Sequence, residues 1–330
     1  MTTSSLPLSS TKIDANVAAV VTEGLVSRPR RLPPWLFYDE AGSRLFDRIT
    51  ELPEYYLTRT ERGILAQHAE EMVALAAGDD ALHVVELGAG SCDKTRLLLK
   101  AAVDRQDTVL YEPVDVSASA LAAAQERLES EIPGIVFCPR VLDYTRDLTL
   151  DEAVCGERRL VLYIGSSIGN FEPHEAQMLL TKVRAALAPG DSLLLGVDLV
   201  KDESILMPAY DDAAGVTAEF NRNILRRINR ELGANFNAEA FAHRARWNPV
   251  ASRMEIHLVS MCQQTVLLPS PPDLDLRIRF AAGETIHTEN SYKYRPGQAE
   301  AMLDAAGFTP AHTWTDERGW FAVVLAKCSE

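Results

Sequence analysis

Short apolar runs alternate with amphipathic stretches between residues 83 and 197, and this alternation dominates the middle of the chain. Strands that alternate with helices favour an α/β fold, a doubly wound Rossmann-like parallel sheet with helices on both faces. The run at residues 159–164 is strongly apolar, so we expect it at the centre of the sheet. We expect Ser117 to cap the helix that follows it. The predicted strands are residues 83–88, 108–111, 135–138, 159–164 and 192–197, and the predicted helices are 94–103, 117–132 and 173–187.

The chain on either side of this region has a different pattern. Two prolines, Pro33 and Pro34, predict an extended passage at residues 31–38. After residue 200 the spacing is mostly helical up to residue 247 and then alternates as in antiparallel strands. Residues 1–12 are polar and are expected to form a flexible tail. The predicted helices are 13–30, 40–50, 58–77, 213–232 and 300–305, and the predicted strands are 252–268, 274–280, 309–315 and 320–327, with a loop at 269–273 and a turn at 317–319.

Length and charge narrow the class of protein. A chain of 330 residues suggests about two domains. Lys and Arg number 33 against 47 Asp and Glu, a net charge of −14 that disfavours nucleic acid and anionic lipid as partners. The N-terminus has no secretory pattern and no run reaches the length of a membrane span, so we expect a soluble, cytoplasmic protein. The five cysteines lack a C-x-x-C pair, so we expect reduced and mostly buried thiols.

A glycine-bearing turn follows the first predicted strand of the alternating region. It reads Glu86-Leu-Gly88-Ala-Gly90, and position 93 is Asp rather than the third glycine of a dinucleotide fingerprint. The turn resembles motif I of the Rossmann-like S-adenosylmethionine methyltransferases, which implies that it holds the methionine part of that cofactor. Glu112 and Asp115 follow the second strand, where the resemblance implies an acid for the ribose hydroxyls. Asp143 and Tyr144 follow the third strand and suit an adenine amino group and ring face.

Further segments resemble one family closely. These are Phe37–Ser43, Leu52–Tyr56, Gly165–Asn170, Tyr210–Thr217, Glu289–Ser291 and Lys293–Arg295. From about residue 30 to the end, the chain resembles the histidine N-alpha-methyltransferases of ergothioneine biosynthesis. The resemblance implies a monomer that uses three S-adenosylmethionine molecules to convert histidine into trimethylhistidine (hercynine). It also implies a methyltransferase domain at 62–199 and 292–330, and a discontinuous α+β substrate-binding domain at 13–61 and 200–291.

Carried over by motif, the resemblance also implies a set of site residues. It places the cofactor at Gly88, Lys94, Asp115, Asp143 and Tyr144, the histidine substrate at Tyr55, Asn170, Tyr210, Glu289, Asn290 and Ser291, and Tyr38 close to the reacting amine.

The residue types fit a free amino acid. Asn170 and Tyr210 can donate hydrogen bonds to a carboxylate, and these neutral donors keep a cation away from the sulfonium of the cofactor. Glu289 can accept from an imidazole N–H while Ser291 serves the other ring nitrogen. Aromatic walls such as Tyr38 and Tyr55 suit a growing quaternary ammonium. Methyl transfer to an amine needs neither an enzyme nucleophile nor a metal, and none is expected.

Other interpretations stay open at this point. Tyr55 could be a packing residue, Asn170 a helix cap, Asp115 the start of a helix, Asp143 a loop residue and Glu289 a solvated strand residue. His287 and Glu289 could share a strand face, but no third metal ligand can be placed. The substrate could be tryptophan or tyrosine, or the protein could sense a small molecule without catalysis. Ile256 falls where the family packs a residue beside the imidazole, and 269–273 is a local lengthening, so either could alter the substrate range.

Overall fold

An eight-stranded sheet organises the computed structural model, which describes residues 15–146, 148–149, 157–270 and 274–329. The strand order is β13-β14-β7-β6-β2-β3-β4, and β5 also pairs with β3. The strands from β2 to β7 run parallel, whereas β14 is antiparallel to β7 and β13 is antiparallel to β14. The five predicted parallel strands and the C-terminal hairpin are therefore confirmed. The bounds are β2 Ala81–Leu87, β3 Val109–Asp115, β4 Ile135–Phe137, β5 Arg140–Val141, β6 Glu157–Tyr163, β7 Ser192–Asp198, β13 Thr309–Thr315 and β14 Phe321–Lys327.

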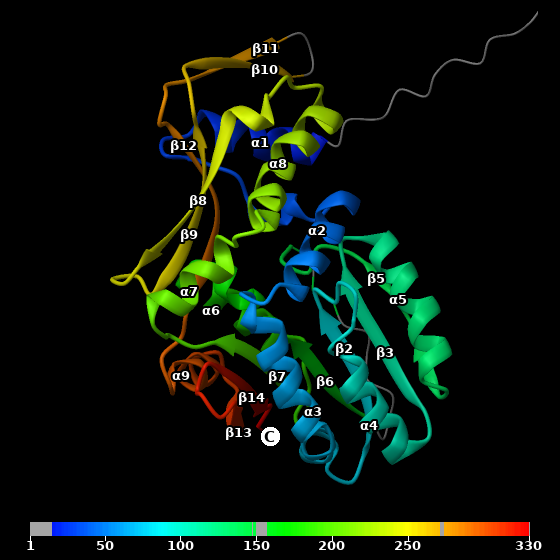
Figure 1. The fold of residues 1–330 in the computed structure, drawn as a ribbon. Coiled ribbons are helices and arrows are strands. Elements are labelled where there is room, and N and C mark those ends of the chain that lie inside the picture. Colours follow the sequence, from blue (N-terminus) through cyan, green and yellow to red (C-terminus); the bar gives the residue numbers. More distant parts are fainter. Residues whose placement is uncertain (1–14, 147, 150–156, 271–273, 330) are drawn as a thin grey trace, which may run out of the picture.

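Helices cover both faces of this sheet (Figure 1). Leu82 and Val84 of β2 point to the face packed by α3, α4 and α5, and Val85 and Leu87 point to the face packed by α6 and α9. Strand β6 lies at the centre between β2 and β7, and its apolar residues 160–162 are fully buried, as predicted. The Ser117 hydroxyl caps α5 by accepting from the Ala120 N–H at 3.3 Å. The helices are α3 Tyr56–Ala77, α4 Arg96–Gln106, α5 Ala118–Glu131, α6 Pro173–Ala185 and α9 Gln298–Ala305.

The remaining elements form a second packed unit, drawn in the upper part of Figure 1. It contains a four-stranded sheet of order β1-β12-β9-β8 and a separate hairpin of β10 and β11. Its core draws on residues 17–57 and 206–286, whereas the cores on the two faces of the large sheet draw on 64–199 and 294–328. The bounds are α1 Ala15–Val26, β1 Arg30–Arg31, η1 Pro34–Phe37, α2 Glu40–Glu51, α7 Glu203–Tyr210, α8 Val216–Leu232, η3 Ala238–Ala240, β8 Phe241–Asn248, β9 Arg253–Ser260, β10 Gln264–Ser270, β11 Leu274–Phe280 and β12 Thr285–Tyr292.

Several predictions in this second unit are wrong. Residues 241–248 form strand β8 rather than helix, because pairing with β9 outweighs the helical preference of their alanines and arginines. The single strand expected at 252–268 is two strands, β9 and β10. Residues 34–37 form a short 3-10 helix, since proline is accepted at the first helical positions. Strand β10 extends to Ser270, into the loop expected at 269–273, whereas β11 has the predicted bounds; residues 271–273 lie outside the described residues.

The cysteines also depart from expectation. Cys92 and Cys328 are buried, but Cys138 and Cys262 are exposed, and these four are free thiols. The expectation that the thiols are mostly buried therefore holds for half of these four, and Cys155 lies outside the described residues. The tail expected at residues 1–12 also lies outside the described residues. Among the residues with described coordinates, no helix is long and apolar enough to cross a bilayer.

Candidate functional site

The first part of the site lies where β2 and β3 end. Gly88 follows β2 at φ +71°, and a Cβ on it would lie 3.4 Å from the Tyr144 hydroxyl. The Gly90 N–H donates to Asp115 Oδ2 at 2.9 Å, and the Ser117 N–H donates to Asp115 Oδ1 at 2.8 Å. The structure therefore brings Gly88, Asp115 and Tyr144 together, and two backbone amides hold the Asp115 carboxylate in place.

Asp143 and Tyr144 continue this edge of the sheet. Asp143 Oδ1 accepts from the Thr145 N–H at 3.0 Å and from the Thr145 hydroxyl at 2.6 Å. These two hydrogen bonds of the Asp143 carboxylate therefore stabilise the local turn. The Tyr144 ring packs edge-on against Tyr163 at 5.8 Å, and burial raises the pKa of Tyr144 to about 12. Tyr144 is therefore a neutral phenol that presents a ring close to the glycine turn.

Lys94 joins two loops of the site. Its ammonium pairs with Glu61 of α3, whose two carboxylate oxygens also accept from the Gly165 N–H at 2.8 and 3.0 Å. Glu61 is fully buried, and a Cβ on Gly196 would lie 2.1 Å from its Oε1. Lys94 is thus tied, through Glu61, to the turn after β6. Glu61 could not be predicted from the sequence, because a single Glu in an amphipathic helix gives no sign that it faces inward.

A second carboxyl group lies beneath the glycine turn. Glu86 is buried and accepts from the Thr95 hydroxyl at 2.6 Å and from the Tyr111 hydroxyl. Burial raises the pKa of Glu86 to about 7, against the effect of these hydrogen bonds. Glu86 therefore connects β2, β3 and the start of α4, and it supports the turn from below.

The second part of the site faces the first from β12 and from the loop after β6. Asn170 ends the 3-10 helix η2, Ser167–Asn170. Its side-chain amide faces two acceptors, and with the nitrogen turned toward them it donates to Glu289 Oε1 at 3.3 Å and to the Asn290 carbonyl oxygen at 3.1 Å. Burial raises the pKa of Glu289 to about 7, and the charge of Lys293 acts in the opposite direction. Glu289 and Ser291 lie two residues apart on β12 and so share one face of the strand.

Three tyrosines surround this face. The Tyr210 hydroxyl at the end of α7 lies 2.9 Å from Ser291 Oγ, and the Tyr55 ring lies 6.5 Å from the Tyr210 ring. The Tyr38 ring contacts those of Phe46 and Phe220 at 5.7 and 5.8 Å. Burial raises the pKa of Tyr38 well above its usual range, and the charges of Glu289 and Asp115 add to the rise, along with Tyr55 and Tyr144. Tyr38 is therefore a neutral phenol packed between Phe46 of α2 and Phe220 of α8.

Asn290 points differently from its neighbours on β12. Its amide donates to Glu172 Oε1 at 2.9 Å, and its Oδ1 lies 2.9 Å from His287 Nε2. The side chain thus leaves the face that carries Glu289 and Ser291, as strand alternation requires. Its carbonyl oxygen is the group that contacts Asn170.

The main residue that sequence analysis missed is Lys293. Its side chain is fully buried, and Nζ lies 2.6 Å from the Tyr210 hydroxyl, 2.8 Å from Ser291 Oγ and 2.8 Å from Asp198 Oδ2. The expectation that no cation lies near the neutral donors is therefore wrong, because an ammonium lies directly behind Tyr210. A lysine two residues after Ser291 shares its strand face, and that spacing was the available sign.

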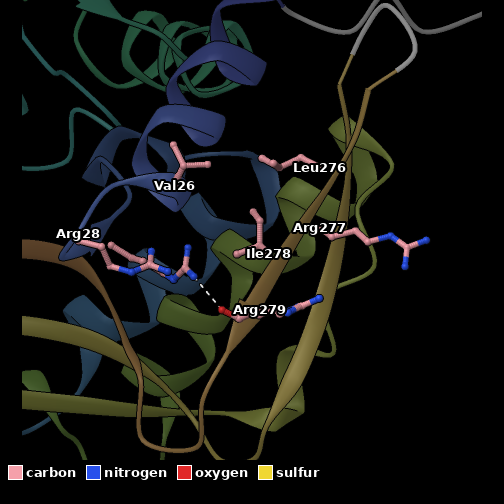
Figure 2. Close-up of a pocket in the computed structure, with 7 residues that line it drawn as sticks. Val26, Arg28, Leu276, Arg277, Ile278 and Arg279 are labelled. Carbon is pink, nitrogen blue, oxygen red and sulfur yellow. Dashed lines mark hydrogen bonds between the residues drawn. The ribbon is translucent and has the colours of Figure 1, made fainter.

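A further pocket lies away from these residues. Figure 2 shows a surface pocket of the second unit, lined by Val26, Arg28, Arg30 and residues 276–279 of β11. Arg30 donates to the Arg279 carbonyl oxygen there at 2.8 Å, and the predicted site residues lie elsewhere. Within the described part of the chain, no cluster of three His, Cys, Asp or Glu side chains could hold a metal ion.

The parallel sheet with one antiparallel strand inserted beside β7, the glycine turn and the carboxylate at the end of β3 define an S-adenosylmethionine-dependent methyltransferase. The family model described as "Histidine-specific methyltransferase, SAM-dependent" matches residues 17–328, and the chain belongs to this family. The family resemblance seen in the sequence is therefore confirmed.

Individual relatives agree with the family. The chain is 46% identical to the histidine N-alpha-methyltransferase of Mycolicibacterium smegmatis and 45% identical to that of Mycobacterium tuberculosis, over 93% of each chain. It is also 31% identical to the ergothioneine biosynthesis protein 1 of Neurospora crassa, over 91% of this chain and 33% of that protein.

Proposed function

We propose that this enzyme methylates the α-amino group of L-histidine three times with S-adenosylmethionine and so makes hercynine, the first step of ergothioneine biosynthesis. The observation that carries the proposal is the pair of Glu289 and Ser291 on one face of β12, beside Asn170. No lysine or arginine of the described chain forms an ion pair with Glu289, so its carboxylate remains available to a ligand. A hydrogen-bond acceptor and a hydroxyl on one strand face suit the two nitrogens of an imidazole.

The cofactor residues fit S-adenosylmethionine. Gly88 leaves open the space that a Cβ would fill beside Tyr144, so the backbone can approach a ligand there. The Asp115 carboxylate retains lone pairs beyond those used by Gly90 and Ser117, and these can accept from ribose hydroxyls. The bound cofactor supplies an electrophilic methyl group. We assign Asp143 and Lys94 to the same half of the site, Lys94 as a support held by Glu61.

The reacting amine belongs between the two halves, beside Tyr38. A phenol whose pKa is raised well above its usual range stays protonated at neutral pH, so Tyr38 does not act as a general base. Its oxygen can accept an N–H of the substrate and orient the nitrogen lone pair, while the ammonium proton leaves to solvent. Alignment of this kind contributes up to about 7–11 kcal/mol in favourable reactions. The rings of Tyr38 and Tyr55 give the growing quaternary ammonium cation–π contacts of about 0.5–2 kcal/mol.

The domain arrangement extends the same proposal. We assign residues 62–199 and 292–330 to cofactor binding, and residues 13–61 and 200–291 to substrate binding. The separate cores described above support this division, with boundaries in the segments between them. We further propose a monomer in the cytoplasm, without nucleic-acid or membrane partners, which the charge of −14 supports.

A substrate competition tests the proposal. Purified enzyme with S-adenosylmethionine receives histidine, tryptophan and tyrosine together, and the methylated products are identified by mass spectrometry. We expect methylated histidine to dominate, because Glu289 and Ser291 offer two polar groups to the ring. Preferential methylation of tryptophan or tyrosine would overturn the choice of substrate. Tight binding of histidine and cofactor without turnover would overturn the catalytic function.

A further inference from the structure

A buried network of charges lies behind the proposed substrate residues. Lys293 is 1% exposed and contacts Asp198 of β7, the Tyr210 hydroxyl and the Ser291 hydroxyl. Asp198 is also fully buried, and it accepts from the Tyr56 hydroxyl at 2.7 Å and pairs with Lys201 at 2.6 Å. The network therefore has two ammonium groups and one carboxylate, and it contacts the substrate side through Tyr210 and Ser291.

The hydrogen atoms of this network can be counted. A lysine ammonium has three N–H donors and no acceptor, so each of its three polar neighbours accepts one hydrogen bond. Tyr210 and Ser291 then keep one hydroxyl proton each. Because their oxygens lie 2.9 Å apart, one of these two protons is used between them. A single hydroxyl proton is left for a ligand, and either Tyr210 or Ser291 can present it.

The bound amino acid determines which of the two hydroxyls, Tyr210 or Ser291, donates its proton to the ligand. A carboxylate can only accept, so contact with Tyr210 requires the Tyr210 proton to point toward it. The Ser291 proton then points to Tyr210, and Ser291 Oγ, with one lone pair already used by Lys293, has one lone pair left. In this state Ser291 can only accept from the ligand, and a ring N–H is the group that it would bind.

We propose that Lys293 is a positioning residue: by donating to both hydroxyls it leaves them one proton for a ligand, and the bound amino acid then takes Tyr210 as donor to its carboxylate and Ser291 as acceptor from its ring N–H. This inference rests on the proposed function, since it deepens the recognition of histidine by the same site. It also assigns the other ring nitrogen to Glu289, with one proton shared between that nitrogen and the carboxylate. A ring that offers a lone pair to Ser291 in place of an N–H is disfavoured.

Lys293→Met tests the inference. The variant leaves Asp198 paired with Lys201 and Tyr56, so no uncompensated carboxylate is buried. We expect the KM for histidine to rise roughly 10- to 100-fold, as for the loss of hydrogen bonds from a charged donor. The kcat and the dissociation constant of S-adenosylhomocysteine should change by less than about threefold, since Lys293 touches neither the amine nor the cofactor residues. The preference for histidine over histamine, which lacks the carboxylate, should shrink.

Two further variants separate positioning from a structural role. Lys201→Met removes the other ammonium from the same carboxylate without touching either hydroxyl, and its histidine KM should stay within about threefold of wild type. Lys293 and Tyr210 both act on the carboxylate of the substrate. The rise in the histidine KM for the double variant, Lys293→Met with Tyr210→Phe, should therefore be smaller than the product of the rises for the two single variants. Lys293→Gln keeps two N–H donors without the charge, so its KM for histidine should rise less than that of Lys293→Met. If Lys293→Met does not bind S-adenosylhomocysteine, Lys293→Gln replaces it in every comparison.

Each outcome has a defined meaning. Normal methylation of histidine by the wild type, with an unchanged KM in the Lys293 variant, overturns this inference and leaves the proposed function standing. An equal rise in KM for Lys201→Met also overturns it, because a general loss of buried charge would then explain the effect. A wild-type enzyme that does not methylate histidine overturns the proposed function, and this inference with it.

Discussion

The Asn170 amide lies 3.3 Å from Glu289 Oε1, which joins the loop after β6 of the large sheet to strand β12 of the second unit. The same amide group also reaches the Asn290 carbonyl oxygen at 3.1 Å, so it fixes the backbone of β12 as well as one carboxylate. Both N–H donors of Asn170 are used by β12, so Asn170 is a contact between the two halves of the site that holds the Glu289 carboxylate in place. We therefore assign the substrate carboxylate to the Tyr210 hydroxyl.

Loss of the Glu289 carboxylate should affect histidine much more than the cofactor. In Glu289→Ala we expect the dissociation constant of histidine to rise roughly 10- to 100-fold, because the ring N–H loses a buried acceptor. Calorimetry in the presence of S-adenosylhomocysteine measures this directly, and the affinity for S-adenosylhomocysteine itself should be unchanged. Glu317→Ala, in the exposed turn before β14, is the matched control. An unchanged affinity for histidine would remove Glu289 from the site.

Histidine binding should depend on pH in a bell shape. The pKa of Glu289 is raised to about 7, and a free imidazole has a pKa of about 6.5. The contact between them needs one proton in total, so affinity is greatest near these two values. It falls at lower pH, where one proton must be released, and at higher pH, where one must be taken up. Calorimetric titrations across this range should give a flatter profile for Glu289→Gln. Identical profiles for both proteins would contradict the shared proton.

The raised pKa of Glu289 also predicts how stability changes with pH. Burial moves the pKa from 4.5 to about 7, so between these values the folded enzyme binds more protons than the unfolded chain. The free energy of unfolding therefore falls as pH rises through this window. Glu289→Gln removes this loss of stability. The Tm of Glu289→Gln minus the Tm of the wild type should therefore be larger above pH 7 than below pH 4.5. A Tm difference that does not vary with pH would argue against a raised pKa.

The cofactor half can be tested separately through Asp115. Asp115→Asn replaces one of the two oxygens that hold the Gly90 and Ser117 amides, and it removes the charge expected to accept from the ribose. We expect the dissociation constant of S-adenosylhomocysteine to rise roughly 10- to 100-fold. Asp104→Asn, on the exposed side of α4, should bind the ligand like wild type. Equal affinities for both variants would exclude Asp115 as a ribose contact.

The sequence was most informative where local pattern and burial agree. The strand around residues 159–164 is apolar on both faces, so its place at the middle of the sheet follows from composition alone. Ser117 and the glycine turn were also predictable, since capping and positive φ values restrict the residue types that are accepted.

The sequence was less informative where tertiary pairing decides. Strand β8 carries alanines and arginines that favour a helix, and only its pairing with β9 makes it extended. Lys293 and Glu61 are buried charges whose partners, Asp198 and Lys94, lie 95 and 33 positions away in the chain. Such pairs depend on how the chain folds back, which no local pattern reveals. The inward-facing lysine behind Tyr210 is therefore a finding of the structure.

The most direct test of the central claim is the mass of the product formed from histidine. Purified enzyme, L-histidine and excess S-adenosylmethionine should yield species carrying one, two and three added methyl groups, with the third accumulating at the end. Fragmentation should place all three methyl groups on the α-nitrogen, because we assign the ring to Glu289 and Ser291. Unmodified histidine at high enzyme concentration, or methyl groups on the imidazole, would contradict the account.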